Sequence, residues 1–464
     1  MVNKIVFLLV LCAFSAYSAV NYPYPQQKSY GNGTINTTVS NASTNLKSKF
    51  TSFLSTHYEE NQGKTLGRIK FDNTQQTVSE GIGYGMIMMV YFSDNSKSYK
   101  DEFDRLWAYY NNFLNGNKLM HWKINGFSNV AEMNAASDAE FDVALALVMA
   151  HYQFGDQKYL EDAKSLIAKI RQYEFDPNNL HRPGDNWNSK RNPSYVSPAA
   201  FEIFKEVETE QAAKWSDIIT ANYTLLKNNQ NKSSVKLPSD WCNDDGSVNG
   251  ANEFGYDASR APWRWAWANA WYGHADAKTL LGNLVSWVNN QIPANIKGPI
   301  QLNGTINGNQ NSTFVGPLTN VLSYSSTYQS KMNDYWNTLI GLNDASYFNK
   351  AMQIITGLLA TGNMPNLKAL AETQPSSSSG GGTPISMLPQ IGLSNSAIAF
   401  KNGINLAVKS YAVVEVFGLK GNSMRKFSFA DGVYSVSFSD LPKGLYVVKL
   451  SFGSERKILR IAVN

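Results

Sequence analysis

The sequence predicts a large all-α domain followed by a small antiparallel β domain. Apolar residues recur at spacings of three and four, the period of a helix, through most of the chain before residue 360. A Ser/Gly run flanked by prolines, Pro375–Pro384, then ends this pattern. Beyond it, apolar and serine residues alternate over Tyr434–Ser439, the period of a strand. All 11 tryptophans precede the run, so the two sides also differ in composition.

The first residues, 1–19, have the order of a secretory signal peptide. Lys4 precedes the apolar run Ile5–Phe14, which is shorter than the ~20 residues that a membrane span requires. A buried first helix is the alternative, but helix-breaking prolines follow at once. Because no other stretch approaches a span, we expect no integral membrane segment and a secreted or cell-surface bacterial protein. Removal of the signal takes away Cys12 and leaves Cys242 without a disulfide partner.

The next region, 20–372, is predicted to consist of helical hairpins. The segments with apolar residues at helical spacing are Phe103–Leu114, Ala139–Gln153, Tyr159–Tyr173, Thr209–Leu226, Leu280–Gln291 and Tyr347–Leu359. Long loops rich in Asn, Gly and Ser separate them. Hairpins packed side by side form either a closed helical barrel or a solenoid, and the lack of a fixed-period repeat argues against the solenoid.

The linker, 373–384, cannot bury apolar area and is predicted to be flexible. The following region, 385–464, reads as hairpins of a small sandwich-like β domain, with strands over Leu445–Phe452 and Lys457–Val463. It carries ten Lys or Arg against four Asp or Glu. These charges are scattered singly between strand residues, so we expect a solvated sheet face and no binding of nucleic acid.

The segment SEGIGYGM, Ser79–Met86, is the first with candidate chemistry. It places Glu80 just before an apolar run, among glycines that allow a ligand to approach the backbone, and next to Tyr84. A poorly solvated carboxyl group has a raised pKa and can act as a general acid. On this segment alone, a role for Glu80 as the partner of a helix dipole is the simpler alternative.

Two further segments carry carboxylates. In Ala135–Gly155, Asp138 precedes a strongly apolar helix, where capping of that helix is the simpler alternative. In Phe254–Trp271, Asp257 and Arg260 stand one helical turn apart among aromatic residues. That pair is commonly only an ion pair, but the Arg would also keep the Asp ionised and fit to act as a base.

Taken together, the three segments predict glycan hydrolysis. A carboxylic acid and a carboxylate flank the bond that is cleaved, and Trp and Tyr rings stack on sugars. The parts of other chemistries are missing from the sequence. It has five histidines and no metal-spaced His/Cys cluster, no phosphate-binding loop, no serine-hydrolase elbow and no dinucleotide fingerprint.

These segments, with NPSYVSPAAF at Asn192–Phe201 between the second and the third, resemble in order and spacing the signature segments of glycoside hydrolase family 8. The resemblance covers about Tyr22–Leu359. It implies an (α/α)6 barrel, in agreement with the predicted helical hairpins. It also implies an inverting mechanism that needs neither a metal nor an organic cofactor.

The resemblance also implies roles for individual residues. Glu80 corresponds to the proton donor, and Asp257 to the general base. Asp138 corresponds to an acid that contacts the sugar at the cleavage point. Tyr256 and Arg260 would then position or polarise Asp257.

Other positions bear on substrate binding. The remaining candidates for contact with the sugar are Tyr84, Trp122, Trp187 and Tyr195. The family usually has Asp where Glu140 stands, and often a polar residue where Ile82 stands. Glu140 keeps the charge on a longer side chain, while Ile82 removes a polar group.

The C-terminal domain resembles, less specifically, the sorting modules of secreted bacterial proteins of the type IX secretion kind. That resemblance implies export through secretion machinery or attachment to the cell surface. A carbohydrate-binding module is the alternative, but this tail has no Trp for a stacking platform.

The function that best fits the sequence is a secreted, inverting endo-β-1,4-glucanase, expected to be a monomer acting on a polysaccharide. The same fold and mechanism acting on xylan, mixed-linkage glucan or chitosan is one alternative. A non-catalytic glycan-binding surface protein is the alternative of another class, and the presence of both Glu80 and Asp257 argues against it.

Overall fold

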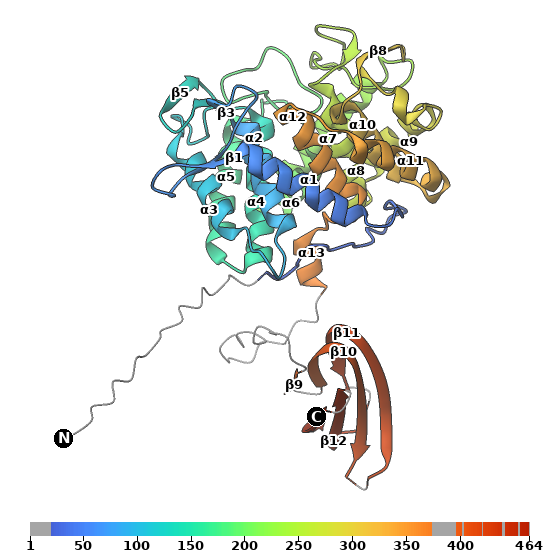
Figure 1. Ribbon diagram of the computed structural model, residues 1–464. Coiled ribbons are helices and arrows are strands. Elements are labelled where there is room, and N and C mark those ends of the chain that lie inside the picture. The colour runs from blue at the N-terminus through green and yellow to red at the C-terminus, as the bar shows by residue number, and fades with distance from the viewer. Residues whose placement is uncertain are drawn as a thin grey trace, which may run out of the picture. The chain divides into compact units, whose positions relative to one another are not determined.

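The computed structural model describes residues 20–373 and 396–463, the latter without 401–402, 420, 439–440 and 453–454. The chain divides into two compact units, Met1–Ser376 and Ser377–Asn464 (Figure 1). The predicted signal peptide and nearly all of the predicted linker lie outside the described residues, so they stay predictions.

An inner ring of helices forms the centre of the first unit. Its members are α2 (Ser79–Phe92), α4 (Ser137–Phe154), α6 (Pro198–Val207), α8 (Ala261–Tyr272), α10 (Ser312–Val321) and α12 (Tyr347–Ala360). Each helix packs on the next, and α12 packs on α2, which closes the ring. Every residue of α10, and every residue of α2 except Glu80, is buried. Helices surrounded on all sides in this way have no polar face.

An outer layer of helices covers the ring. Its members are α1 (Ala42–His57), α3 (Lys100–Asn112), α5 (Gln157–Tyr173), α7 (Ala212–Gln230), α9 (Ala275–Asn289) and α11 (Gln329–Gly341). They pack on α12, α2, α4, α6, α8 and α10 respectively. Each buries one stripe, which in α5 consists of Tyr159, Ala163, Leu166, Ile167 and Ile170.

The two layers form an (α/α)6 barrel, so the closed helical barrel predicted from the sequence is confirmed. All the segments predicted to be helical are helical over most of their length. A short last helix, α13 (Leu367–Glu372), packs on α4.

Short antiparallel sheets lead into two of the inner helices. One contains β3 (Gln76–Val78), β4 (Lys123–Asn125) and β5 (Asn129–Glu132), and the chain passes from β3 directly into α2. Another contains β6 (Glu253–Phe254), β7 (Gly298–Gln301) and β8 (Ile306–Asn309), and β6 leads to the 3-10 turn η2 (Ala258–Arg260) before α8. β1 (Tyr58–Glu60) pairs with β2 (Gly67–Ile69). Figure 1 shows β3, β5 and β8 at one end of the barrel.

The second unit is an antiparallel sheet, as predicted for the C-terminal domain. Its strands are β9 (Ser396–Phe400), β10 (Gly403–Gly418), β11 (Ser423–Ser437), β12 (Gly444–Phe452) and β13 (Glu455–Val463). The order is β11-β10-β12-β13, and β9 pairs with the first part of β10, whose register shifts between Val408 and Tyr411. Alternate residues of β12, such as Val448 and Leu450, are buried in its core.

No helix within the described ranges is long and apolar enough to cross a membrane.

Candidate active site

The predicted catalytic residues lie where inner helices begin. Glu80 is in the first turn of α2, and Asp138 is in the first turn of α4. Asp257 and Arg260 lie immediately before α8, and Tyr347 is the first residue of α12. Because these side chains contact one another, the N-terminal ends of four inner helices meet at one end of the ring, where their dipoles favour negative charge.

Arg260 joins the three predicted catalytic carboxylates. Its Nη1 donates to Glu80 Oε2 at 2.5 Å and to Asp138 Oδ2 at 2.6 Å. Its Nη2 lies 3.5 Å from Asp257 Oδ1. The guanidinium is only 3% exposed, which strengthens these charged interactions. The sequence predicted its contact with Asp257 alone, since residues far apart in the chain supply the other two.

Glu80 has the protonation behaviour of a general acid. Burial raises the pKa of Glu80 to about 7, because the loss of water outweighs the attraction of Arg260, and nearby Asp138 adds to the increase. Tyr347 donates its hydroxyl to Oε1 at 3.1 Å, which favours the charged form but does not reverse the shift. The side chain is still 17% exposed. Glu80 can therefore carry a proton to a bound molecule near neutral pH.

Asp138 is the second residue of α4, and the N-cap position before this helix is occupied by Ala136, which makes no side-chain cap. Burial raises the pKa of Asp138 to about 6 against the opposing charges of Arg260 and Arg264. Its Oδ1 is buried and finds no hydrogen-bond partner among the described residues. That oxygen therefore keeps acceptor capacity that no described donor uses.

Asp257 is the most accessible of the three carboxylates, with 39% of its side chain exposed. Its Oδ2 accepts from the indole Nε1 of Trp241 at 2.9 Å. The same upstream segment holds the backbone around Asp257, since Asp240 Oδ1 accepts from the amides of Gly255 at 2.9 Å and Ala258 at 2.7 Å. Neither Asp240 nor Trp241 was predicted, because no sequence signal linked their segment to the motif.

A second ion pair lies one helical turn behind the first. Arg264 donates to both carboxylate oxygens of Asp142, at 2.6 and 2.8 Å, and both side chains are buried. Asp142 follows Asp138 by four residues, as Arg264 follows Arg260. The two pairs therefore lie one above the other between α4 and α8 and fix the angle of these helices. The same spacing of four residues between the two aspartates and between the two arginines was the sequence signal that could have revealed the pair of Asp142 and Arg264.

Several predicted sugar-binding aromatic residues lie around the cluster. The Tyr195 ring lies 5.0 Å from the Arg260 guanidinium. Tyr256, next to Asp257, is 48% exposed. Trp187 is 41% exposed, and its ring centroid lies 4.9 Å from that of Trp241.

The other two predicted sugar-binding residues differ from each other. The carbonyl of Trp122 accepts from the amide of Ser79 at 2.8 Å, which places this half-buried tryptophan beside Glu80. Tyr84 is fully buried and packs edge-on against Trp263. A ring without exposed surface cannot stack on a sugar, so Tyr84 lies behind Glu80 rather than against a substrate.

The two positions that depart from the family pattern are both buried. Ile82 is fully buried in the barrel core. Glu140 points to Tyr110, whose hydroxyl lies 3.3 Å from Oε1, and toward the buried Glu174. Burial raises the pKa of both Glu140 and Glu174 well above the usual value. The charge of Asp138 raises the pKa of Glu140 further, and the charge of Glu140 raises that of Glu174.

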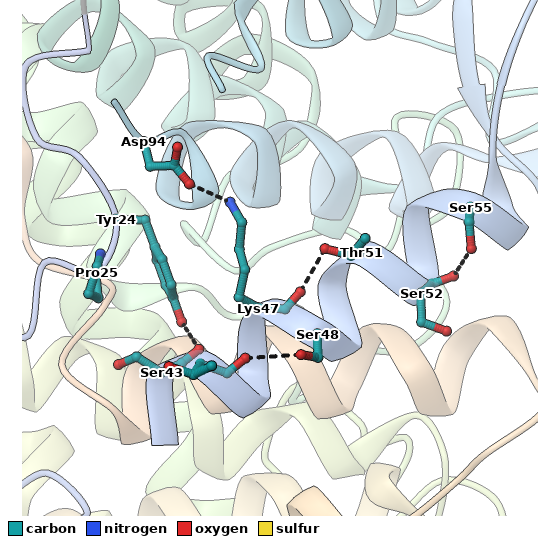
Figure 2. A pocket seen from close by; sticks show the side chains of 10 residues that line it. Tyr24, Pro25, Ser43, Lys47, Ser48, Thr51, Ser52, Ser55 and Asp94 are labelled. Carbon is teal, nitrogen blue, oxygen red and sulfur yellow. Dashed lines mark hydrogen bonds and ion pairs between the residues drawn. The ribbon is translucent and has the colours of Figure 1, made fainter. Parts of the chain in front are cut away.

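A pocket of about 700 Å³ lies elsewhere, beside α1 (Figure 2). Its lining consists of Tyr24, Pro25, Ser43, Thr44, Lys47, Ser48, Thr51, Ser52, Ser55 and Asp94. Figure 2 shows Lys47 directed at Asp94, and their charged atoms lie 3.1 Å apart. The lining thus supplies one carboxylate, already paired, and not the two that glycan hydrolysis requires. In the part of the chain that the structure describes, no group of His, Cys, Asp and Glu is arranged to hold a metal ion.

Several known proteins are similar to this chain. The model of the glycosyl hydrolases family 8 matches residues 22–363. Endoglucanase 2 of Ruminiclostridium josui is 31% identical over 379 residues, which cover 77% of this chain and 80% of the relative. A beta-glucanase of Niallia circulans is 29% identical over 390 residues, with 77% and 94% covered. The apo structure of a beta-1,3-1,4-glucanase from Paenibacillus sp. X4 superposes with a TM-score of 0.68 at 26% identity, covering 74% of this chain and 99% of that one.

Proposed function

This chain belongs to glycosyl hydrolases family 8 and is a glycoside hydrolase, and from that premise we propose that it is a secreted, inverting endo-β-1,4-glucanase. The observation that carries the proposal is the contact of one guanidinium, Arg260, with Glu80, Asp138 and Asp257. Arg260 thereby links Glu80, an acid of raised pKa, to the more exposed carboxylate of Asp257. This cluster lies at the N-terminal ends of the inner helices.

The proposed reaction divides its proton transfers between two residues. Glu80 donates its proton to the glycosidic oxygen as the bond between that oxygen and the anomeric carbon breaks. Asp257 accepts a proton from the water that forms the new bond on the opposite face, and the configuration inverts. Asp138 is assigned the contact with the sugar at the cleavage point, as the family resemblance implies, and Arg260 holds its other oxygen, Oδ2.

Inversion is proposed from the family resemblance. Arg260 contacts Glu80 through Nη1 and Asp257 through Nη2. Inverting enzymes hold these groups about 6.5 to 9.5 Å apart to admit a water, whereas retaining enzymes hold them at about 5 to 5.5 Å.

The substrate is proposed to be a β-1,4-linked glucan. Relatives named endoglucanase support this choice, and exposed Trp187 and Tyr256 offer rings for stacking on glucose units. Mixed-linkage glucan is the second candidate, because the compared beta-1,3-1,4-glucanase has a similar barrel.

The test is reducing-sugar release by the purified full chain from carboxymethylcellulose, barley β-glucan, xylan and chitosan. Release from the glucans that is lost in Glu80→Gln supports the substrate and the acid. Release from xylan or chitosan alone keeps the mechanism and replaces the substrate. A folded protein that releases sugar from none of them would favour the non-catalytic glycan-binding alternative.

Export is part of the proposal. Residues 1–19 serve as a signal peptide, the catalytic domain 20–372 acts as a monomer, and the linker 373–384 joins it to the sorting or attachment domain 385–464. The antiparallel sheet found there supports a compact module, for which we propose a sandwich-like form. Detection of a mature N-terminus near residue 20 in the culture medium or at the cell surface tests this part.

A further inference from the structure

We propose that Trp241 is a positioning residue for Asp257, and that its ring connects the exposed Trp187 to the carboxylate that activates water. The inference rests on the proposed function, because it takes Asp257 as the general base. It adds to that function a residue outside the segments that carry the family resemblance.

Trp241 fixes one oxygen of Asp257. Its Nε1 donates to Oδ2 at 2.9 Å, while Arg260 Nη2 lies 3.5 Å from Oδ1. The indole thus makes the shorter of the two contacts, and a carboxylate held at both oxygens has one orientation. A general base must hold its accepting oxygen within about half an ångström of the position that reaches the water. The residue that fixes the rotation of the Asp257 carboxylate therefore controls the rate.

The backbone of Trp241 is itself held firmly. Its carbonyl accepts from the amide of Asn249 at 2.9 Å and from the hydroxyl of Ser239 at 2.9 Å. The next residue, Cys242, exchanges two backbone hydrogen bonds with Arg191, at 2.8 and 2.9 Å. The preceding residue, Asp240, accepts from the two amides that flank Asp257 in the chain, as described above. The donor and the acceptor therefore belong to one rigid unit.

The outer face of Trp241 meets a second indole. Its ring lies 4.9 Å from the ring of Trp187, with 36° between their planes. The ammonium of Lys190 lies 3.9 Å from the centre of the Trp241 ring and 5.4 Å from that of Trp187. The loop that carries Trp187 and Lys190 continues into Arg191, which is bonded to Cys242.

Through this connection, a sugar bound to Trp187 influences the orientation of Asp257. A glucan long enough to reach Trp187 packs against a ring that is in contact with Trp241, which in turn is bonded to Asp257. Binding energy gained at Trp187 is then used to hold the base in its reactive orientation, which raises kcat rather than only lowering KM.

The experiment replaces Trp241 by Phe in the full chain, which removes the N–H and keeps an aromatic ring. The matched control is Trp107→Phe, because Trp107 Nε1 donates to Asp162 Oδ2 at 2.8 Å, an equivalent bond on α3 and α5 away from the cluster. Rates on barley β-glucan are measured across pH for wild type, both variants and Asp257→Asn.

We expect Trp241→Phe to lower kcat about tenfold with KM within about twofold of wild type. We also expect the acidic limb of the pH profile of kcat/KM to move to higher pH by about half a unit to one unit. The reason is that the Asp257 carboxylate has lost a donor that favours its charged form. Trp107→Phe should leave kcat, KM and the limb unchanged.

Several charged or titratable groups face Asp257, and all of them remain in the variant. They are Arg260, Asp240, Tyr195, Lys190 over the Trp241 ring, and Glu80 and Asp138 through Arg260. A moved limb therefore reports the lost indole bond.

An unmoved acidic limb in Trp241→Phe would overturn the proposal, whether or not kcat falls, since a merely structural role lowers the rate without moving the limb. Failure of the proposed function has a different signature, which is absence of sugar release by wild type or full activity in Asp257→Asn.

Discussion

Buried carboxylates on helix α4 and at the end of α5 form two sets that differ in their partners. Asp138 and Asp142, four residues apart on one face, each contact an arginine of the segment that forms η2 and α8. Glu140 projects from another face, toward Tyr110 and Glu174. Two oxygens of Glu174 and one of Glu140 are buried and find no hydrogen-bond partner within the described residues.

The difference shows that the supply of a cation, and not burial alone, assigns a role to each carboxylate. Burial raises the pKa of Asp138 only to about 6, because the positive charges of Arg260 and Arg264 oppose the rise. No arginine opposes the effect of burial at Glu140 and Glu174, and burial raises the pKa of both well above the usual value. Asp138 therefore belongs to the candidate catalytic cluster, while Asp142, Glu140 and Glu174 influence the stability of the fold.

The largest effect is expected where a buried pair is broken. Arg264→Met leaves Asp142 buried without its partner and should lower the free energy of unfolding by about 3 to 5 kcal/mol. Arg171→Met is the control, because the pair of Arg171 and Glu208 is partly exposed and should cost under about 1 kcal/mol. Urea unfolding measures both. Equal losses would mean that burial does not distinguish the two pairs.

The next effect concerns the pH dependence of activity. Glu80 must be protonated to act as the acid, so kcat should fall as pH rises through about 7 and decline about tenfold per pH unit above it. The native state also binds this proton more tightly than the unfolded chain between 4.5 and about 7, so the free energy of unfolding falls as pH rises through that window. A profile that stays flat to pH 9 would exclude Glu80 as the acid.

A smaller effect of opposite sign is expected in the unpaired set. Glu174→Gln keeps the shape, removes a group that resists ionisation, and offers an amide to the free oxygen of Glu140. Because the pKa of Glu174 is raised in the fold, its cost appears as pH rises above the ordinary value of a glutamate. The variant should be about 1 to 2 kcal/mol more stable than wild type at pH 8 and nearly equal at pH 4. Thermal unfolding at the two pH values checks this, and a loss of stability at pH 8 would contradict it.

The smallest effect is expected from Tyr347→Phe. The Tyr347 hydroxyl lowers the pKa of Glu80 by donating to its Oε1, so its loss should raise that pKa further. The basic limb of the activity profile should move up by about half a pH unit. Tyr335→Phe is a matched control, because its buried hydroxyl donates only to the carbonyl of Val288. A limb that moves down would mean that Tyr347 does not stabilise the charged form.

The sequence predicted the amphipathic helices better than the fully buried ones. The outer helices α3, α5, α7 and α9 were predicted because each alternates one apolar stripe with a polar face. The inner helices α8 and α10 were not located, since a helix that is buried nearly all round shows little period in its hydrophobicity. The equally buried α4 was located from its long apolar run, whereas α6, α1 and α11 were missed although each has exposed or half-exposed positions. The short strands, of two to four residues, were missed because alternation needs a longer run.

The candidate site divides in a similar way. Glu80, Asp138 and Asp257 were found because each stands in a recognisable segment, and the structure brings them together on Arg260. Tyr347 was missed, because it contacts Glu80 from 267 residues away and only the closure of the barrel brings them together.

The central claim is that an acid, Glu80, and a base, Asp257, act from opposite sides of the glycosidic bond. Proton NMR of the first product formed from cellohexaose tests it most directly, because the anomeric signals are resolved before mutarotation mixes them. The account predicts that the new reducing end appears first as the α anomer. First appearance of the β anomer would show retention and would contradict the assignment of Asp257 as the base that activates water.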